Sequence, residues 1–252
     1  MAITLQSLAT PQAKPVIATI LGEAGVGKTT LAATFPSPVI IPVEDGLQAL
    51  EGKNIPAFPL CTSSAQVFEC IAALDNDANE FKTVIVDSVT RFNEIIEKEI
   101  VESDDKNPAS INQALGGYGA GHQAVAQKHR TLRDALGYLR DERGMHVVVI
   151  AHADTDTVEL PDTDMFQRYT LRMNKKSVSA YVDNVDLVGL LRLKTYTRGD
   201  GEKKKATSDG TVELVCHPQA SSVSKNRYGI KAPLIVEEGV NPLVDVISSL
   251  KS

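Results

Sequence analysis

Eight consecutive residues near the start of the chain have the types and spacing that bind the phosphates of a nucleotide. Residues 22–29 read GEAGVGKT and match the pattern G-x-x-x-x-G-K-[ST] at every fixed position. In such a loop the glycines let backbone N–H groups converge on the phosphates, the lysine reaches the β and γ oxygens, and the threonine hydroxyl is a ligand of Mg²⁺. We therefore predict that ATP and Mg²⁺ bind here. The residues predicted to bind the nucleotide are Gly22, Glu23, Ala24, Gly25, Val26, Gly27, Lys28, Thr29 and Thr30.

Two acidic residues follow predicted strands and could complete a phosphate site. Asp87 closes the apolar run TVIVD and fits the carboxylate that, with Thr29, holds Mg²⁺ through its water shell; an aspartate at a strand end also often caps a helix. Glu44 follows VIIPV and is suited to orient or deprotonate an attacking water, or is an ordinary carboxylate of a turn. The residue pattern alone leaves both pairs of alternatives open.

The surrounding segments predict a sheet that carries these residues on one edge. The run VIATIL at 16–21 precedes the loop and KTTLAATF follows it, which is the strand, loop and helix order that a phosphate-binding unit requires. Further strands are predicted at 39–43, 83–87 and 146–152. Ligands of open α/β sheets bind at the carboxyl ends of the strands. We therefore predict an α/β fold with a mostly parallel sheet flanked by helices.

The connecting segments predict helices, loops and an antiparallel addition to the sheet. The glycine-rich residues 103–121 predict a mobile loop, and the acidic residues 153–164 an irregular one. Strands at 187–197 and 211–216 follow one another without a helix between them, so antiparallel pairing is expected at the C-terminal side. The expected helices cover about 63–74, 89–100, 122–143 and 241–250.

Length and composition indicate a single domain. A chain of 252 residues, 42% of them hydrophobic, can bury a substantial core, and we expect one domain over 1–252 with a core at about 15–238, a short segment at 1–14 and a C-terminal helix at about 241–250. Neither an apolar stretch of membrane length nor a signal-peptide pattern occurs, so we expect no membrane association and a cytoplasmic location, in the host cytoplasm if a phage encodes the protein. The formal net charge of −6 argues against non-specific adhesion to nucleic acid.

Several of these segments together resemble the core of the RecA-like recombinases over about residues 15–235. They are KTT after the loop, EDG after the second strand, VIVDSV at the third strand, and the polar residue that closes VVVIAH. The resemblance implies a RecA-like P-loop NTPase fold and a catalytic role for Glu44. It also implies that His152 stands where this family places a glutamine that senses the γ-phosphate.

A second resemblance concerns the end of the predicted sheet. Lys225-Asn226-Arg227 is similar to the Lys-Asn-Lys element with which RecA-type subunits reach the nucleotide of a neighbour. It implies a homo-oligomer with the nucleotide at the subunit interface, in which Lys225 and Arg227 act in trans; the other reading is that both are solvated surface cations. The stretches YGAGHQ and SKNRYG further resemble the small phage proteins of the single-strand annealing group called Sak-four.

A basic and aromatic segment, FQRYTLRMNKK, predicts a surface for single-stranded DNA, because such surfaces combine base stacking with phosphate neutralisation. The acidic residues before it, from Asp154 to Asp164, would repel phosphates unless they are neutralised. A second basic stretch, at 198–205, could also contact DNA, but we interpret it as a solubilising turn. The residues predicted to contact DNA are Phe166, Arg168, Tyr169, Arg172, Lys175 and Lys176.

Together these features predict a Mg-dependent ATPase, slow unless assembled or stimulated by DNA. We expect it to act on single-stranded DNA in phage recombination or strand annealing, with a single-strand binding protein as a further partner. The acidic balance also fits an alternative: a nucleotide-dependent switch or assembly factor that binds a protein partner without DNA.

Overall fold

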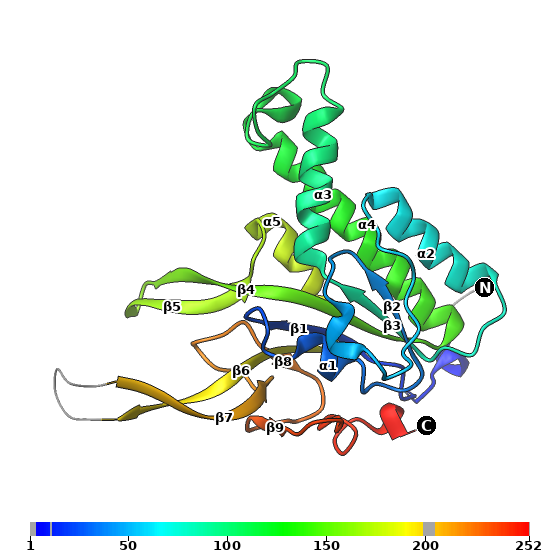
Figure 1. Cartoon of the computed structure of the whole chain (residues 1–252), viewed down its shortest axis with the longest axis vertical. Helices are drawn as coiled ribbons and strands as arrows, with labels where there is room; N and C mark the ends of the chain where they lie inside the picture. Colours follow the sequence, from blue (N-terminus) through cyan, green and yellow to red (C-terminus); the bar gives the residue numbers. More distant parts are fainter. Residues whose placement is uncertain (1–3, 11, 199–204, 252) are drawn as a thin grey trace.

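A computed structural model of the protein describes residues 4–10, 12–198 and 205–251. Figure 1 shows a central sheet with helices on both faces and a pair of helices that projects from the body. The strands are β1 (Ile17–Gly22), β2 (Pro38–Pro42), β3 (Thr83–Asp87), β4 (His146–Leu160), β5 (Thr163–Leu171), β6 (Leu187–Arg198), β7 (Lys205–Val215), β8 (Lys225–Asn226) and β9 (Leu234–Val236). The α-helices are α1 (Lys28–Ala32), α2 (Ser64–Asn76), α3 (Val89–Glu102), α4 (Ala120–Arg143) and α5 (Lys175–Val178).

Within the described residues the strands form one sheet whose main path runs β2-β3-β4-β1-β6-β7-β9. Strands β2, β3, β4, β1 and β6 run parallel to one another along this path. Strands β7 and β9 add to it in antiparallel pairs, β5 pairs antiparallel with β4, and β8 pairs antiparallel with β6. The predicted fold class is therefore confirmed: the sheet is mostly parallel, helices flank it, and antiparallel strands lie at its C-terminal side.

The register of the parallel strands brings distant sequence segments to one edge of the sheet. Gly22, at the end of β1, pairs with His152 of β4, and Pro42, at the end of β2, pairs with Asp87 of β3. Strand β4 lies between β1 and β3, so the phosphate loop and Asp87 flank it. The carboxyl ends of β1, β2 and β3 thus meet beside His152 of β4 at the ligand edge that the sequence predicts.

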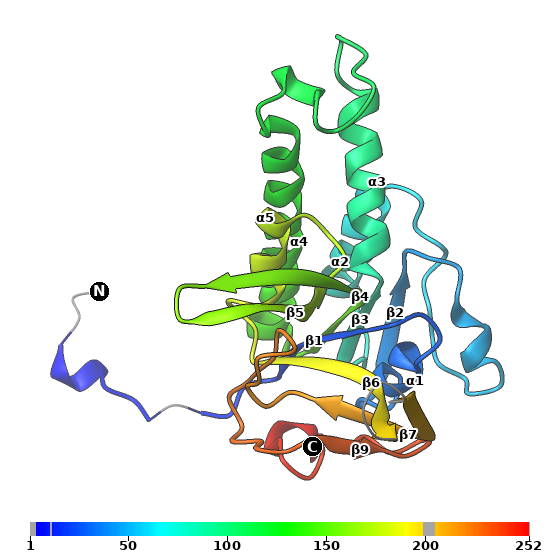
Figure 2. The same cartoon turned by 90° about the vertical axis from the view of Figure 1, so that its left-hand side faces the viewer.

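Both faces of the parallel strands are covered, which explains why these strands read as continuous apolar runs. All six residues of β1 are buried. Helices α2, α3 and α4 pack on one face through side chains such as Phe92 and Leu132. Helix α1 and the C-terminal segment pack on the other face through Leu31 and Leu243. Figure 2 shows these two layers on opposite sides of the sheet.

Two helix starts follow the capping chemistry of the sequence. Ser63 caps α2, and its side chain and that of Gln66 form the predicted capping box. Ser88 caps α3 by accepting a hydrogen bond from the backbone N–H of Arg91. The sequence left open whether Asp87 caps this helix. Because Ser88 is the cap, the Asp87 carboxylate is available for other contacts.

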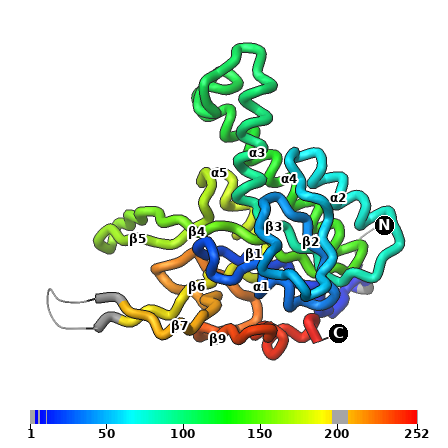
Figure 3. Tube along the Cα trace, viewed as in Figure 1, coloured from blue at the N-terminus to red at the C-terminus, as the bar shows by residue number. Residues whose placement is uncertain are grey.

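Residues 103–121 differ from the predicted mobile loop, since they close an ordered projection built from α3 and α4 (Figure 3). The Asp104 carboxylate accepts hydrogen bonds from the backbone N–H groups of Lys106 and Leu115 and so ties the loop together. Gly121 lies so close to the Ile111 carbonyl that a Cβ would stand 2.2 Å from that oxygen. Gly121 therefore permits tight packing here, in place of the flexibility that the number of glycines suggested.

Residues 153–164 also differ from the prediction, because β4 continues to Leu160 and pairs with β5 in a hairpin that extends beyond the edge of the sheet (Figure 1). Threonine and valine alternate with the acidic residues along this segment, and β-branched side chains favour an extended backbone. The hairpin is largely exposed, so its carboxylates remain in water while the backbone groups pair across strands. Residues 199–204 of the basic turn lie outside the described residues.

The C-terminal segment 241–250 forms successive turns, with a 3₁₀ helix at Ser248–Lys251, in place of the predicted helix. Hydrogen bonds such as those from Val244 to Asn241 and from Leu250 to Ile247 span three residues. Leu243, Ile247 and Leu250 are buried against the sheet. Their spacing suggested a helix. In so short a segment, however, burial of these side chains stabilises the structure more than helical hydrogen bonds would.

Candidate active site

The residues of the loop at 22–29 have the backbone conformations that a phosphate cradle requires. Gly25 and Gly27 have φ angles of 77° and 97°, in the left-handed region that favours glycine. A Cβ on Gly22 would stand 2.5 Å from the Leu191 carbonyl oxygen, so this position also excludes a side chain. These glycines keep the loop narrow and its backbone close to any bound phosphate.

Lys28 lies under this loop at the first position of α1. Its ammonium donates hydrogen bonds to the carbonyls of Gly22 and Glu23, at 3.0 and 2.7 Å. Burial of the side chain lowers the pKa of Lys28. The nearby carboxylates of Asp87 and Glu44 oppose this shift, so the ammonium stands between the loop and two negative charges. A phosphate oxygen in the loop would find a partly desolvated cation, which strengthens the attraction.

Asp87 and Thr29 form a pair of hard oxygen donors beside Lys28. The Thr29 hydroxyl donates to Asp87 Oδ2 at 2.6 Å. The carboxylate is buried, which raises its pKa, and its second oxygen, Oδ1, has no hydrogen-bond partner. An unsatisfied buried carboxylate oxygen is a site for a metal-bound water, and hydroxyl and carboxylate oxygens are ligands that Mg²⁺ prefers. The two residues therefore fit the predicted magnesium site; a bound Mg²⁺ would neutralise charge on the phosphates.

Glu44 is positioned by the backbone of Asp87 and by the ring of His152. The backbone N–H groups of Val43 and Glu44 both donate to the Asp87 carbonyl, which holds the end of β2 against β3. His152 Nε2 lies 3.2 Å from Glu44 Oε1 and 3.3 Å from Oε2. This hydrogen bond from His152 is the largest cause that lowers the pKa of Glu44. Glu44 is therefore a carboxylate with a fixed orientation and can accept a proton from a water.

The structure separates Lys225 and Arg227 from this edge. Asn226, which lies between them, pairs with Leu187, and Leu187 pairs with Ala18, four residues before Gly22 on β1. That offset corresponds to about 13 Å along the strand. Lys225 donates to the carbonyls of Val182 and Asp183, and Arg227 Nη1 lies 2.9 Å from Asp186 Oδ1. These cations therefore lie at the opposite end of the strands from their own phosphate loop, and their action in trans stays a prediction.

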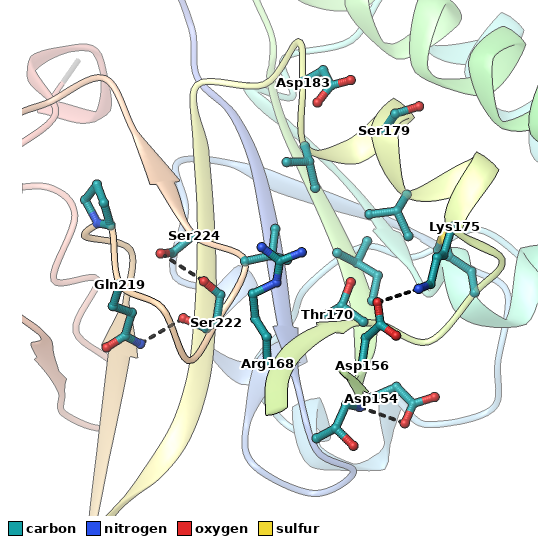
Figure 4. Close-up of a pocket in the computed structure, with 17 residues that line it drawn as sticks. Asp154, Asp156, Arg168, Thr170, Lys175, Ser179, Asp183, Gln219, Ser222 and Ser224 are labelled. Carbon is teal, nitrogen blue, oxygen red and sulfur yellow. Dashed lines mark hydrogen bonds and ion pairs between the residues drawn. The ribbon is translucent and has the colours of Figure 1, made fainter. Parts of the chain in front are cut away.

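The residues predicted to contact DNA lie in different environments. Arg168 and Lys175 line a cavity of about 660 Å³ between the β4–β5 hairpin, α5 and residues 218–224, shown in Figure 4. Tyr169 lines another cavity, of about 510 Å³, together with residues 23–26 of the phosphate loop. Lys176 contacts the carbonyl of Gly119, the residue before the start of α4.

Phe166 and Arg172 complete the predicted set. Phe166 lies on the hairpin, where it pairs with Val158 and is partly buried. Arg172 is exposed, and its backbone N–H donates to the His152 carbonyl at 2.9 Å. Composition placed it among the DNA residues, but the antiparallel register places it beside His152. The sequence could have shown this proximity only if a hairpin had been predicted between His152 and Arg172. That hairpin was missed because residues 153–164 were predicted as an irregular loop.

Thr30 of the predicted nucleotide set lines a smaller cavity on the outer side of the loop. This cavity has a volume of about 230 Å³ and is also lined by Gly27, Thr34 and residues 236–240. Helix α1 supplies one wall and the segment after β9 the other. Residues 236–240 carry no sequence pattern that marks them as part of a site, so only their packing brings them to the loop.

A parallel sheet that ends in a glycine-rich phosphate loop, with a lysine, a threonine–aspartate pair and an oriented glutamate, defines a P-loop nucleotide-binding protein. A family model described as an AAA domain matches residues 14–228, and the chain therefore belongs to this family of P-loop ATPases. No curated protein matched the chain. Among the described residues, no helix has both the length and the apolar character needed to cross a membrane.

Proposed function

We propose that this chain is a RecA-like, Mg-dependent ATPase that acts on single-stranded DNA in phage recombination or strand annealing, as the Sak-four group does. It works as a homo-oligomer with the nucleotide at the subunit interface, and a single-strand binding protein is a further partner. The observation that carries the hydrolytic part is the Glu44 carboxylate, which the His152 ring holds at the same edge as Lys28, Thr29 and Asp87.

In this proposal Glu44 orients a water for attack on the γ-phosphorus and accepts its proton. Its lowered pKa favours the anionic form that this role needs. Lys28 binds phosphate oxygens, and the loop N–H groups orient the triphosphate. Thr29 and Asp87 hold Mg²⁺. His152 keeps the Glu44 carboxylate in place, and the neighbour's Lys225 and Arg227 add positive charge from across the interface. In support of this last role, 57% of the Arg227 side chain is exposed despite its ion pair with Asp186.

The cavity beside the hairpin supports the DNA part of the proposal. In Figure 4 the Arg168 side chain stands in the middle of the cavity and joins none of the dashed interactions, whereas Lys175 pairs with Asp156. The Arg168 Nε atom is buried and has no hydrogen-bond partner. A phosphate of a single strand would satisfy this guanidinium. The ion pair with Lys175 neutralises one of the carboxylates that the sequence predicts to repel DNA.

The alternative proposal is a nucleotide-dependent switch that binds a protein partner without DNA. Its support is the net charge of −6, together with Asp154 and Asp183, which also line the cavity. These carboxylates would suit a basic segment of a protein better than a phosphate backbone. The two proposals predict different responses of ATP turnover to DNA.

The deciding experiment is ATP turnover with and without a single-stranded oligonucleotide across a salt series, with Lys28→Ala as the control. Phosphate contacts release counterions on binding, so stimulation by DNA should weaken as salt rises. Stimulation that fades with salt and is lost in Lys28→Ala supports the recombination proposal. Turnover that depends on Lys28 but is indifferent to DNA at every salt concentration contradicts it and favours the switch.

A further inference from the structure

Arg172 lies next to the phosphate site through the continuation of the β4–β5 ladder. Ala153 pairs with Leu171 at the base of the hairpin, and the same register makes Arg172 the partner of His152. The hydrogen bond from the Arg172 N–H to the His152 carbonyl, at 2.9 Å, confirms this pairing. Side chains of directly opposed residues in an antiparallel pair leave the same face of the sheet, with Cβ atoms about 5 Å apart. Arg172 therefore starts on the face from which the His152 ring reaches Glu44.

The guanidinium of Arg172 is available for a ligand. Arg172 is exposed, and within the part of the chain that the structure describes it forms no ion pair. Its backbone is held beside His152, whose ring contacts Glu44 at the sheet edge that also carries Lys28. Two cations that face one region repel each other, and an anion between them would remove that cost. Lys28, whose ammonium lies under the phosphate loop, identifies this region as the one that a nucleotide's phosphates would occupy.

We propose that Arg172 contacts the terminal phosphate of the nucleotide bound to its own subunit and is a catalytic residue in cis. The inference rests on the proposed ATPase activity. In hydrolysis, the oxygen of water forms a bond to the γ-phosphorus, the bond from that phosphorus to the bridging oxygen of ADP breaks, and Glu44 receives the proton of the water. Arg172 neutralises negative charge on the γ-phosphate oxygens during this exchange.

This assignment gives Arg172 a different role from the other arginines near the sheet. Arg168, on β5, lines the cavity of Figure 4, and Arg227 pairs with Asp186 at the opposite end of the strands. Of these three arginines, Arg172 is the one whose backbone N–H donates to the His152 carbonyl. Because its strand leads into the hairpin, a contact with the γ-phosphate would also hold the base of the hairpin in one position.

The first test is the affinity for nucleotides of Arg172→Ala and Arg172→Lys, measured with Mg²⁺ for a slowly hydrolysed ATP analogue and for ADP. Arg172→Ala should bind the triphosphate analogue roughly 10-fold more weakly, which corresponds to the loss of one charged hydrogen bond, and should bind ADP as before. Arg172→Lys should recover part of the loss. The matched control is Arg130→Ala, because Arg130 bonds Gln127 on the same exposed stretch of α4. Equal losses for both nucleotides, or none, would overturn the inference.

The second test separates action in cis from action in trans. Arg172→Ala should lower the turnover number by roughly 10²–10³-fold, as loss of a group that stabilises transition-state charge does. Arg172→Ala and Lys28→Ala subunits are then mixed. If Arg172 acts on its own nucleotide, no site in the mixture has both residues, so turnover stays at the level of the separate variants. Restored turnover contradicts the cis assignment.

The same measurements distinguish failure of this inference from failure of the proposed function. Unaltered protein that binds no ATP would reject the ATPase itself. Unaltered protein that binds and hydrolyses ATP, combined with an Arg172→Ala variant that does both equally well, would reject only the role of Arg172. Thermal unfolding of each variant without nucleotide shows whether a loss comes from the site or from the fold.

Discussion

His152 and Glu44 are 108 residues apart in the sequence, and the His152 ring nitrogen Nε2 lies 3.2 Å from the Glu44 carboxylate. The backbone of His152 is held by a hydrogen bond from its N–H to the Thr90 hydroxyl at 2.9 Å. The imidazole thus connects the middle of β4 to the segment that follows β2, across β3. We expect this link to set both the orientation and the protonation of the proposed general base.

Replacement of His152 by alanine should shift the pH dependence of ATP turnover. The hydrogen bond from His152 is the largest cause that lowers the pKa of Glu44, so its loss should raise that pKa. A base with a higher pKa is protonated at higher pH, and the acidic limb of the turnover profile should move upward in pH. A pH series of steady-state turnover for Ala, Gln and unaltered proteins tests this. An acidic limb that stays in place would show that Glu44 is not the group that titrates.

The variant Asp87→Asn should separate metal binding from stability. Burial raises the pKa of Asp87, so the folded state binds the proton more tightly than the unfolded state, and the stability from this group falls as pH rises. A neutral amide removes this cost and can still accept the bond from Thr29. Thermal unfolding with a chelator at neutral pH should therefore show a higher midpoint for the variant.

The same variant should lose the response to magnesium. With ATP present, added Mg²⁺ should raise the unfolding midpoint of the unaltered protein, because a ligand that binds the folded state stabilises it. Asp87→Asn should show little or none of this increase. An equal response in both proteins would place the metal elsewhere.

The stability of the fold should depend on pH through His129, which is fully buried between Tyr181 and Asn93. Burial lowers the pKa of His129 to about 3. Between an ordinary pKa near 6.5 and this value, only the unfolded chain binds the proton, so stability falls as pH falls. From pH 7 to pH 5 the loss amounts to about 2 kcal/mol at roughly 1.4 kcal/mol per pH unit. The free energy of unfolding of His129→Gln, measured with denaturant, should lack this loss at low pH. The difference in stability between the unaltered protein and the variant should therefore become smaller as pH falls.

Replacement of Arg168 by alanine should weaken binding to single-stranded DNA. Loss of one phosphate contact should lower affinity across all sequences and reduce the slope of log affinity against log salt by about 0.7. Fluorescence anisotropy with a labelled oligonucleotide measures both quantities. The control is Arg130→Ala, which removes an arginine from α4, away from the cavity. An unchanged salt slope in Arg168→Ala would remove this cavity from the proposed DNA surface.

Arg227 should behave differently from Arg172 when subunits are mixed. If Arg227 reaches the nucleotide of a neighbour, a mixture of Arg227→Ala and Lys28→Ala subunits contains interfaces where an intact Lys28 faces an intact Arg227. Turnover should then rise above that of either variant alone. Full activity of pure Arg227→Ala would instead identify Arg227 as a structural partner of Asp186.

Much of the fold followed from local patterns in the sequence. The strand at Thr83–Asp87 and the capped start of α2 agree with the prediction, because a buried parallel strand is an apolar run and a capping box is a short-range motif. The segment after His152 was predicted wrongly, since its acidic composition hid a hairpin whose backbone pairs over a distance. The turns at 241–250 were missed because burial of side chains overrode a helical spacing.

For the site, the sequence by itself predicted the phosphate loop with Lys28 and Thr29, and it placed two carboxylates, Asp87 and Glu44, at strand ends. These assignments need only a short motif and the rule that parallel strands end at one edge. Tertiary structure alone decided that His152 contacts Glu44, that Arg172 lies beside His152, and that Arg227 lies at the opposite end of the strands. Each of these depends on strand order and register, which are set by packing between segments far apart in the chain and leave no mark on the spacing of neighbouring residues.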